Sequence, residues 1–173
     1  ALIVTLPLNA GPCFLFVALD TSPEFLARGG LASFSATFAV HTFTTVYAWA
    51  SGRLKGFWLV WAAAVAAWLL ISIPLLQFNL TLTSATIVVA CGFGLSHLLR
   101  DRRFDQGSAP THAARQVSIR FLIVRALIGG SIVALTASAA KFLGPDLTGL
   151  GFAFPVMLTA SAWMLYTAYG PTF

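Results

Sequence analysis

One apolar stretch of the sequence carries polar side chains at a regular helical spacing. Four of them recur every four positions, with Thr44 beside the last, and they are Ser33, Thr37, His41 and Thr45. This spacing places them along one face of a helix. His41 can exchange a proton near neutral pH, so the pattern favours a proton relay or a solute contact along a pathway. A neutral imidazole bonded to a neighbouring helix, with hydroxyls bonded to their own backbone, also explains it.

The other histidines predict less chemistry. His97 lies three residues before Arg100, near the expected end of a helix, where an imidazole needs no function. His112 lies in a polar segment. As a pair, His41 and His97 can ligate a haem or a chlorophyll-type pigment, but nothing in their spacing requires one. The cofactor therefore stays unknown.

No enzyme signature appears. The sequence has no paired carboxylates inside an apolar segment, no zinc-protease motif and no phosphate loop, and its five acidic residues fall at or outside segment ends. Cys13 and Cys91 lack a neighbouring cysteine or histidine, which indicates buried thiols rather than metal ligands. We therefore predict a protein that is not an enzyme and has no metal site.

Prolines inside apolar segments form a second group of candidate functional positions. Pro7, Gly11 and Pro12 interrupt the first segment, with Asn9 between them, and Pro155 lies in the last. Proline removes a backbone donor and frees a carbonyl, which in lipid must be satisfied by protein or water. Transporters use such breaks to present polar backbone to a solute, although proline kinks also occur without that role.

A stripe of small residues in the fifth segment indicates helix packing. Small side chains at every fourth position let a second helix approach closely. The stripe consists of Ala126, Gly130, Ala134 and Ser138.

The composition identifies the elements that must hold these residues. Of 173 residues, 58% are hydrophobic and only 9% are charged, against about 25% charged residues in soluble domains. Such a chain cannot cover a water-facing surface, so we expect an all-α transmembrane bundle in a lipid bilayer. A crossing takes about 20 apolar residues. Six segments meet or approach this length: 2–19, 31–50, 57–76, 80–99, 121–140 and 147–169.

The charges predict a topology and a division of the chain. Eight of the ten basic residues fall in or beside the loops 51–56 and 100–120, which six crossings place on one face. The positive-inside rule makes that face cytoplasmic, in a bacterial inner membrane. The net charge of +5 thus indicates orientation rather than nucleic-acid binding, because aromatic platforms are missing. A linker, 101–118, separates a first half of four segments, 1–100, from a second half of two, 119–173.

The first and last segments can be aligned as a repeat. Five segments separate the equivalent elements, so the predicted topology gives them opposite orientations, which is an inverted repeat of the kind found in secondary transporters. The aligned identities are Leu2 with Leu150, Pro7 with Pro155, Pro23 with Pro171, and Phe25 with Phe173.

Short apolar motifs carry a family resemblance. An apolar helix is followed by Gly144-Pro145, Gly149-Leu150 and Phe154-Pro155, and the chain opens with Leu6-Pro7 and Gly11-Pro12. Residues 120–170 resemble the opening helix pair of the GlpM-like small inner-membrane proteins and their larger, uncharacterised two-repeat relatives. The resemblance implies a membrane fold of transport-like architecture, with no substrate to carry over. It also implies that these residues belong to a protein of about ten helices.

Two functions stay open at this point. The first is a transporter-like or channel-like bundle of unknown solute, with its pathway between the His41 face and the broken first helix. The alternative is a non-catalytic structural subunit, or a pigment- or lipid-holding one, of a larger membrane complex. Its partners would be the bilayer and either other membrane subunits or further copies of the chain.

Overall fold

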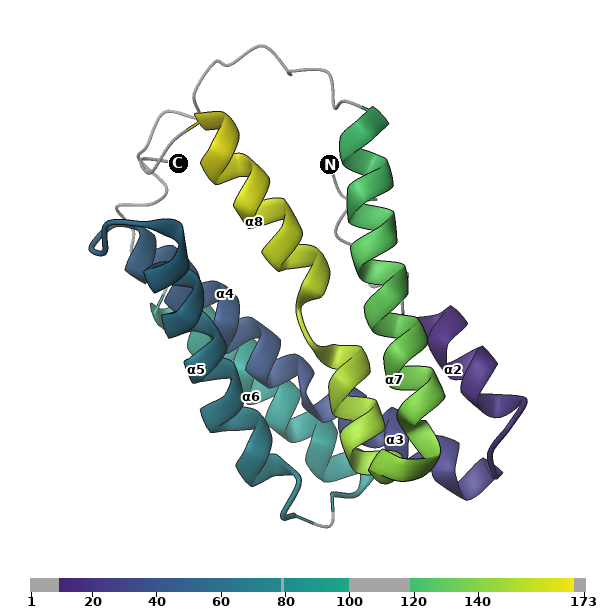
Figure 1. The fold of residues 1–173 in the computed structure, drawn as a ribbon. Helices are drawn as coiled ribbons and strands as arrows, with labels where there is room; N and C mark the ends of the chain where they lie inside the picture. Colours follow the sequence, from purple (N-terminus) through teal and green to yellow (C-terminus); the bar gives the residue numbers. More distant parts are fainter. Residues whose placement is uncertain (1–9, 79, 100–118, 170–173) are drawn as a thin grey trace.

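The computed structural model describes residues 10–78, 80–99 and 119–169, and in that part of the chain every regular element is an α-helix. The expected all-α class is therefore confirmed. Figure 1 shows the arrangement of the helices. In chain order they are α2 (Ala10–Ala18), α3 (Pro23–Ser35), α4 (Thr37–Ser51), α5 (Phe57–Leu75), α6 (Leu82–Leu99), α7 (Ile119–Ala153) and α8 (Val156–Tyr169).

Helix α5 closely follows its predicted apolar segment. The preceding residue, Gly56, has a φ of 105°, a left-handed conformation that glycine adopts without strain and that turns the chain into the helix. Pro74 lies in the last turn, and the Leu76 N–H bonds back to the carbonyls of Ser72 and Ile73. The hairpin expected between the third and fourth segments therefore lies between α5 and α6.

Helix α3 begins earlier than predicted. We expected one helix starting at residue 31, whereas α3 starts at Pro23 and α4 follows as a separate element. The Ser22 hydroxyl accepts a hydrogen bond from the Phe25 N–H at 3.2 Å, and proline suits the first turn because its missing N–H would be unpaired there anyway. The backbone N–H of Glu24 and the Ser22 hydroxyl hold the pKa of that carboxyl below its usual range. This capped start makes the polar residues before 31 helical.

Helix α7 folds back on itself at Gly144. The φ of Gly144 is 77°, a value that favours glycine, so the helix reverses there. We call residues 119–143 the long arm of α7 and residues 145–153 its short arm. The chain breaks again at Phe154 and Pro155 before α8, so the predicted sixth segment consists of two helices. Proline has no N–H to continue the short arm.

The helices pack in two groups that meet at the short arm. Helix α4 lies between α5 and α6, while α3 packs against α7 (Figure 1). Helix α8 leads from the short arm to the start of α5, where the rings of Phe57 and Trp163 stand 4.8 Å apart. The buried core joins both groups and consists of Ala36, Ala39, Phe43, Ala64, Trp68 and Leu150.

Apolar surface dominates the described helices. Two stretches are long and apolar enough to cross a membrane, Phe57–Leu75 and Ala126–Trp163, and only 22% and 11% of their apolar windows are buried. A core helix of a soluble protein would be mostly buried. The second stretch turns back at Gly144 and therefore does not form one straight crossing. The structure thus has apolar helices suited to a membrane, and six crossings stay a prediction.

Helix α3 and the short arm of α7 cross at backbone contact. Gly29 and Gly149 are both buried, and a Cβ atom built on Gly149 would overlap the carbonyl oxygen of Gly29. A Cβ on Gly29 would in turn lie 3.2 Å from the carbonyl oxygen of Pro145. Only residues without a side chain allow this approach, so the crossing depends on both glycines.

The substitution Gly149→Ala should destabilise the protein by about 1–3 kcal/mol, because the added methyl group forces two backbones apart. The matched control is Gly130→Ala, also in α7, where an added Cβ meets nothing within 4 Å. Thermal unfolding in mild detergent would measure both. Equal midpoints for the two variants would contradict the close crossing.

Candidate functional site

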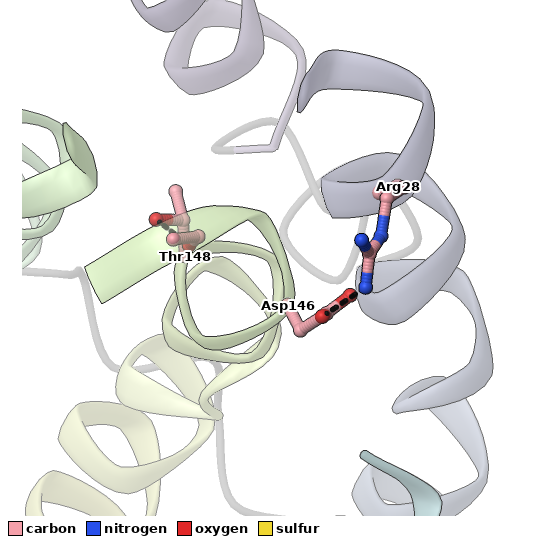
Figure 2. Close-up of polar contacts among 4 residues, drawn as sticks. Arg28, Asp146 and Thr148 are labelled. Atoms are coloured by element: carbon pink, nitrogen blue, oxygen red, sulfur yellow. Dashed lines mark hydrogen bonds and ion pairs between the residues drawn. The ribbon is translucent and has the colours of Figure 1, made fainter. Parts of the chain in front are cut away.

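Two ion pairs join the α2–α3 turn to the fold-back of α7. The Arg28 Nη2 donates to the Asp146 Oδ2 at 2.8 Å, and the Lys141 Nζ lies 2.7 Å from the Asp20 Oδ2. Figure 2 shows Arg28 reaching from α3 to Asp146 on the short arm. Lys141 and Asp146 lie on either side of Gly144-Pro145, so a salt bridge within the turn or two solvated charges would both fit the sequence. Each instead pairs with a residue more than a hundred positions away, so the charges bind two hairpins together.

Thr148 stabilises the fold-back from inside. Its side chain is fully buried, and its Oγ1 donates to the carbonyl oxygen of Gly144 at 2.7 Å (Figure 2). The bond holds the first turn of the short arm, which carries Asp146, in place.

A cavity of about 300 Å³ lies beside the Arg28–Asp146 pair. Its walls come from α3, the end of α5, the α5–α6 connection and the short arm. Arg28, Phe78 and Thr81 are exposed and form its mouth, whereas Ser35 and Ser72 are buried. The volume is at the lower end of the range of small-molecule sites. The remaining lining residues are Leu31, Ala32, Ala36, Leu75, Leu76, Leu80, Asp146 and Leu150.

Ser72 lines this cavity and has a hydroxyl without a hydrogen-bond partner among the described residues. Its side chain is fully buried, and its Oγ finds no hydrogen-bond partner among the described residues. Hydroxyls on other helices bond back to their own backbone, as Thr42 does to Phe38 and Thr86 does to Leu82. An unpaired buried hydroxyl costs about 1–3 kcal/mol. Ser72 therefore adds to the cavity wall a buried hydroxyl without a described hydrogen-bond partner.

The predicted polar face of the second segment lies elsewhere. Ser33 and Thr37 are half-buried, and neither they nor His41 and Thr45 line the cavity. The carbonyl of His41 accepts from the hydroxyls of Thr44 and Thr45 at 2.8 and 2.9 Å. These two hydroxyls bond to the backbone of their own helix. This agrees with the structural interpretation of the polar face rather than with a solute pathway.

The His41 ring contacts α6. Its centroid stands 3.9 Å from that of Phe93, and its Nε2 is buried without a hydrogen-bond partner in the described part of the chain. His97 lies in the same helix, α6, as Phe93. Among the described residues, no group of three or more metal-binding side chains lies together. The structure thus places His41 at a helix contact rather than at the cavity.

The structure describes only some of the predicted broken-helix positions. Pro7 and Asn9 lie outside the described residues. Gly11 and Pro12 lie within helix α2, so no break separates them from the rest of that helix. Pro155 stands between α7 and α8, where the helix is interrupted. A cavity formed partly by the first helix therefore has no support in the described residues.

The small-residue stripe faces away from the rest of the described chain. All four of its members are exposed, and a Cβ on Gly130 would meet nothing within 4 Å. No described residue therefore covers the stripe. The members are Ala126, Gly130, Ala134 and Ser138.

Sequence reasoning missed the residues that form the cavity. Arg28, Asp146, Ser35 and Ser72 were not among the candidate positions. Ser72 carried a signal, because it is a polar residue in a long uncharged run and lies two positions before Pro74. Nothing in the sequence showed that it faces Ser35 and Leu150 across one cavity.

Comparison with family models, with curated proteins and with solved structures gives no match. The resemblance to the GlpM-like proteins stays a prediction from short motifs. The cavity and the surface of this chain are therefore the features that indicate its function.

The substitution His41→Phe should stabilise the protein by about 1–2 kcal/mol, because it removes a buried ring nitrogen without a partner among the described residues and keeps an aromatic contact with Phe93. Thermal unfolding in mild detergent would measure the change. His41→Gln, which keeps a buried polar group, serves as control and should not stabilise. A destabilised His41→Phe protein would mean that His41 has a partner, such as a cofactor.

Proposed function

We propose that this chain is an integral membrane protein of transporter-like or channel-like architecture, with the cavity beside Arg28 and Asp146 as its solute site. The membrane would be a bacterial inner membrane, and the chain would cross it six times. Large exposed apolar side chains support a lipid environment, since a water-soluble monomer rarely exposes so much contiguous apolar surface. Examples are Leu70, which is 72% exposed, and Leu135, which is 69% exposed.

The position of the cavity is the observation that carries the proposal. One interrupted helix contributes to its walls: Leu150 lies in the short arm, which Pro155 separates from α8. Helix α3 continues into α4 through Ala36, whose N–H bonds to the Ala32 carbonyl. Solute sites of secondary transporters lie at discontinuous helices of this kind. A break allows the two halves of a helix to move separately, which alternating access requires.

Charge separation supports the proposed orientation. The end of the bundle with the fold-back holds Asp20, Arg28, Lys141 and Asp146 in pairs. The opposite end of α4 leads to the exposed basic loop with Arg53, whose guanidinium carbon lies 4.5 Å from the centre of the Trp49 ring. A basic loop at one end and ion-paired charges at the other favour placing the basic end in the cytoplasm.

The exposed stripe of α7 favours a second candidate function. A non-catalytic subunit of a membrane complex would cover Gly130 and its neighbours with a helix of another chain, since small residues allow close packing. Under this alternative the cavity would hold a structural lipid or stay empty. Other chains that copurify in stable proportion would support it.

Sided labelling would test the topology. In a background of Cys13→Ala and Cys91→Ala, Lys55→Cys should react with a membrane-impermeant thiol reagent only from the cytoplasmic side. Phe142→Cys, at a position 93% exposed near the fold-back, should react only from the opposite side. Reaction of both variants from one side would contradict six crossings.

A thiol at the base of the cavity would test transport. Ser35→Cys should react from the outer side, where the mouth opens, and also from the cytoplasmic side as the bundle exchanges conformations. Ala64→Cys, fully buried in the core between the helices, is the matched control and should react from neither side. If Ser35→Cys reacts from the outer side alone, the structural-subunit function is favoured instead.

A further inference from the structure

The cavity has a charged mouth whose net charge is zero. A hydrogen bond from the Arg28 Nη2 to the Asp146 Oδ2 joins the two side chains. A guanidinium has five N–H donors and a carboxylate accepts about four hydrogen bonds, so both groups have capacity left for a ligand. A carboxylate would be attracted by Arg28 and an ammonium by Asp146. A ligand that carries both charges complements the mouth, whereas one net charge would be repelled by one partner.

The wall between mouth and base is apolar. On α3 the lining residues follow a single helix face, because Leu31 and Ala32 stand between Arg28 and Ser35 at helical spacing. Seven residues of helix separate Arg28 from Ser35, which is roughly 10 Å along the axis. The leucines at the end of α5 and in the short arm complete the wall. A ligand spanning the cavity therefore needs a short apolar stem.

The base of the cavity is polar and uncharged. The Ser72 hydroxyl has no partner among the described residues and can donate one hydrogen bond. The Ser35 hydroxyl donates to the carbonyl oxygen of Ala32 at 2.9 Å, which leaves its oxygen free to accept. One donor and one acceptor at the base match an uncharged group that both accepts and donates, such as a primary amide.

We propose that the cavity binds a small zwitterion whose short apolar side chain ends in an uncharged hydrogen-bonding group, the class to which L-glutamine belongs. Its carboxylate would face Arg28, its ammonium would face Asp146, and its amide would bond to Ser72 and Ser35. This inference deepens the proposed function, on which it rests, by naming a substrate class.

Binding of radiolabelled L-glutamine to the whole chain in lipid nanodiscs would test the inference. Wild-type protein should bind it saturably, and L-leucine, which has the same charges and no amide, should compete more weakly. Arg28→Gln and Asp146→Asn should each weaken glutamine binding about tenfold or more, since each removes a charged partner. Arg53→Gln, which changes a cation at the opposite end of the bundle, is the control and should leave binding unchanged.

The variant Ser72→Ala tests the base of the cavity separately from its mouth. It should weaken L-glutamine binding about three- to tenfold and leave L-leucine binding unchanged, because only the amide uses the hydroxyl. The variant should remain folded, since it removes an unpaired polar atom. Absence of saturable glutamine binding by folded wild-type protein would overturn the inference, as would equal losses for both amino acids in Ser72→Ala. The sided labelling of Lys55→Cys and Phe142→Cys needs no ligand, so it shows separately whether the proposed membrane topology fails.

Discussion

The crossing of α3 with the short arm of α7 determines where the other parts of the fold can lie. Gly29 and Gly149 bring two backbones into contact, and the ion pair between Arg28 and Asp146 lies one residue before the crossing on α3 and three before it on the short arm. The two interactions are complementary. The glycines permit the close approach of the two helices. The ion pair and the hydrogen bond of Thr148 then fix how the short arm is oriented against α3. Neither exposed ion pair alone would hold two hairpins, because such pairs contribute about 0–1 kcal/mol each.

The cavity follows from that crossing. Helices that touch at one point diverge on either side of it, and Ser35 and Leu150 lie further along the two helices that touch. Helix α5 closes the third side with Ser72. Since small residues at the crossing set the distance between the walls, a larger residue at Gly149 would change the cavity as well as the stability. Packing and binding are thus linked through one contact.

The described residues contain three buried polar atoms without hydrogen-bond partners, and their surroundings distinguish them. The Trp68 Nε1 belongs to a ring packed edge-on against Phe154 at 5.0 Å, within the core. The His41 Nε2 belongs to a ring tilted against that of Phe93, with 3.9 Å between the ring centres. Ser72 alone of the three lines the cavity. A buried polar atom indicates a ligand only where there is space for the ligand. Ser72 is therefore a better candidate for a ligand contact than the more reactive imidazole of His41.

The sequence predicted the helices better than it predicted the site. Apolar length located α5 and α6 almost fully, because a long uncharged run has few alternatives to a helix. It missed the start of α3, where local capping by Ser22 outweighs the polar composition. The site could not be predicted because Arg28 and Asp146 are 118 positions apart, and their pairing depends on the fold-back at Gly144. The spacing of His41 and its neighbouring hydroxyls was regular, yet regularity along one helix does not show which neighbour that face meets.

Because the chain has few charged residues, each of them has a large effect on the orientation of the chain and on the ligand that the cavity selects. Five acidic residues cannot neutralise ten basic ones, and two of the five, Asp20 and Asp146, are used at the fold-back end. Pairing there removes net charge from that end and leaves the basic excess at the other end. Under the positive-inside rule, a basic excess favours the cytoplasmic side. The same pairing gives the cavity a mouth with both signs of charge and no net charge. Orientation in the membrane and selection of a zwitterion would then have a common origin in the pair between Arg28 and Asp146.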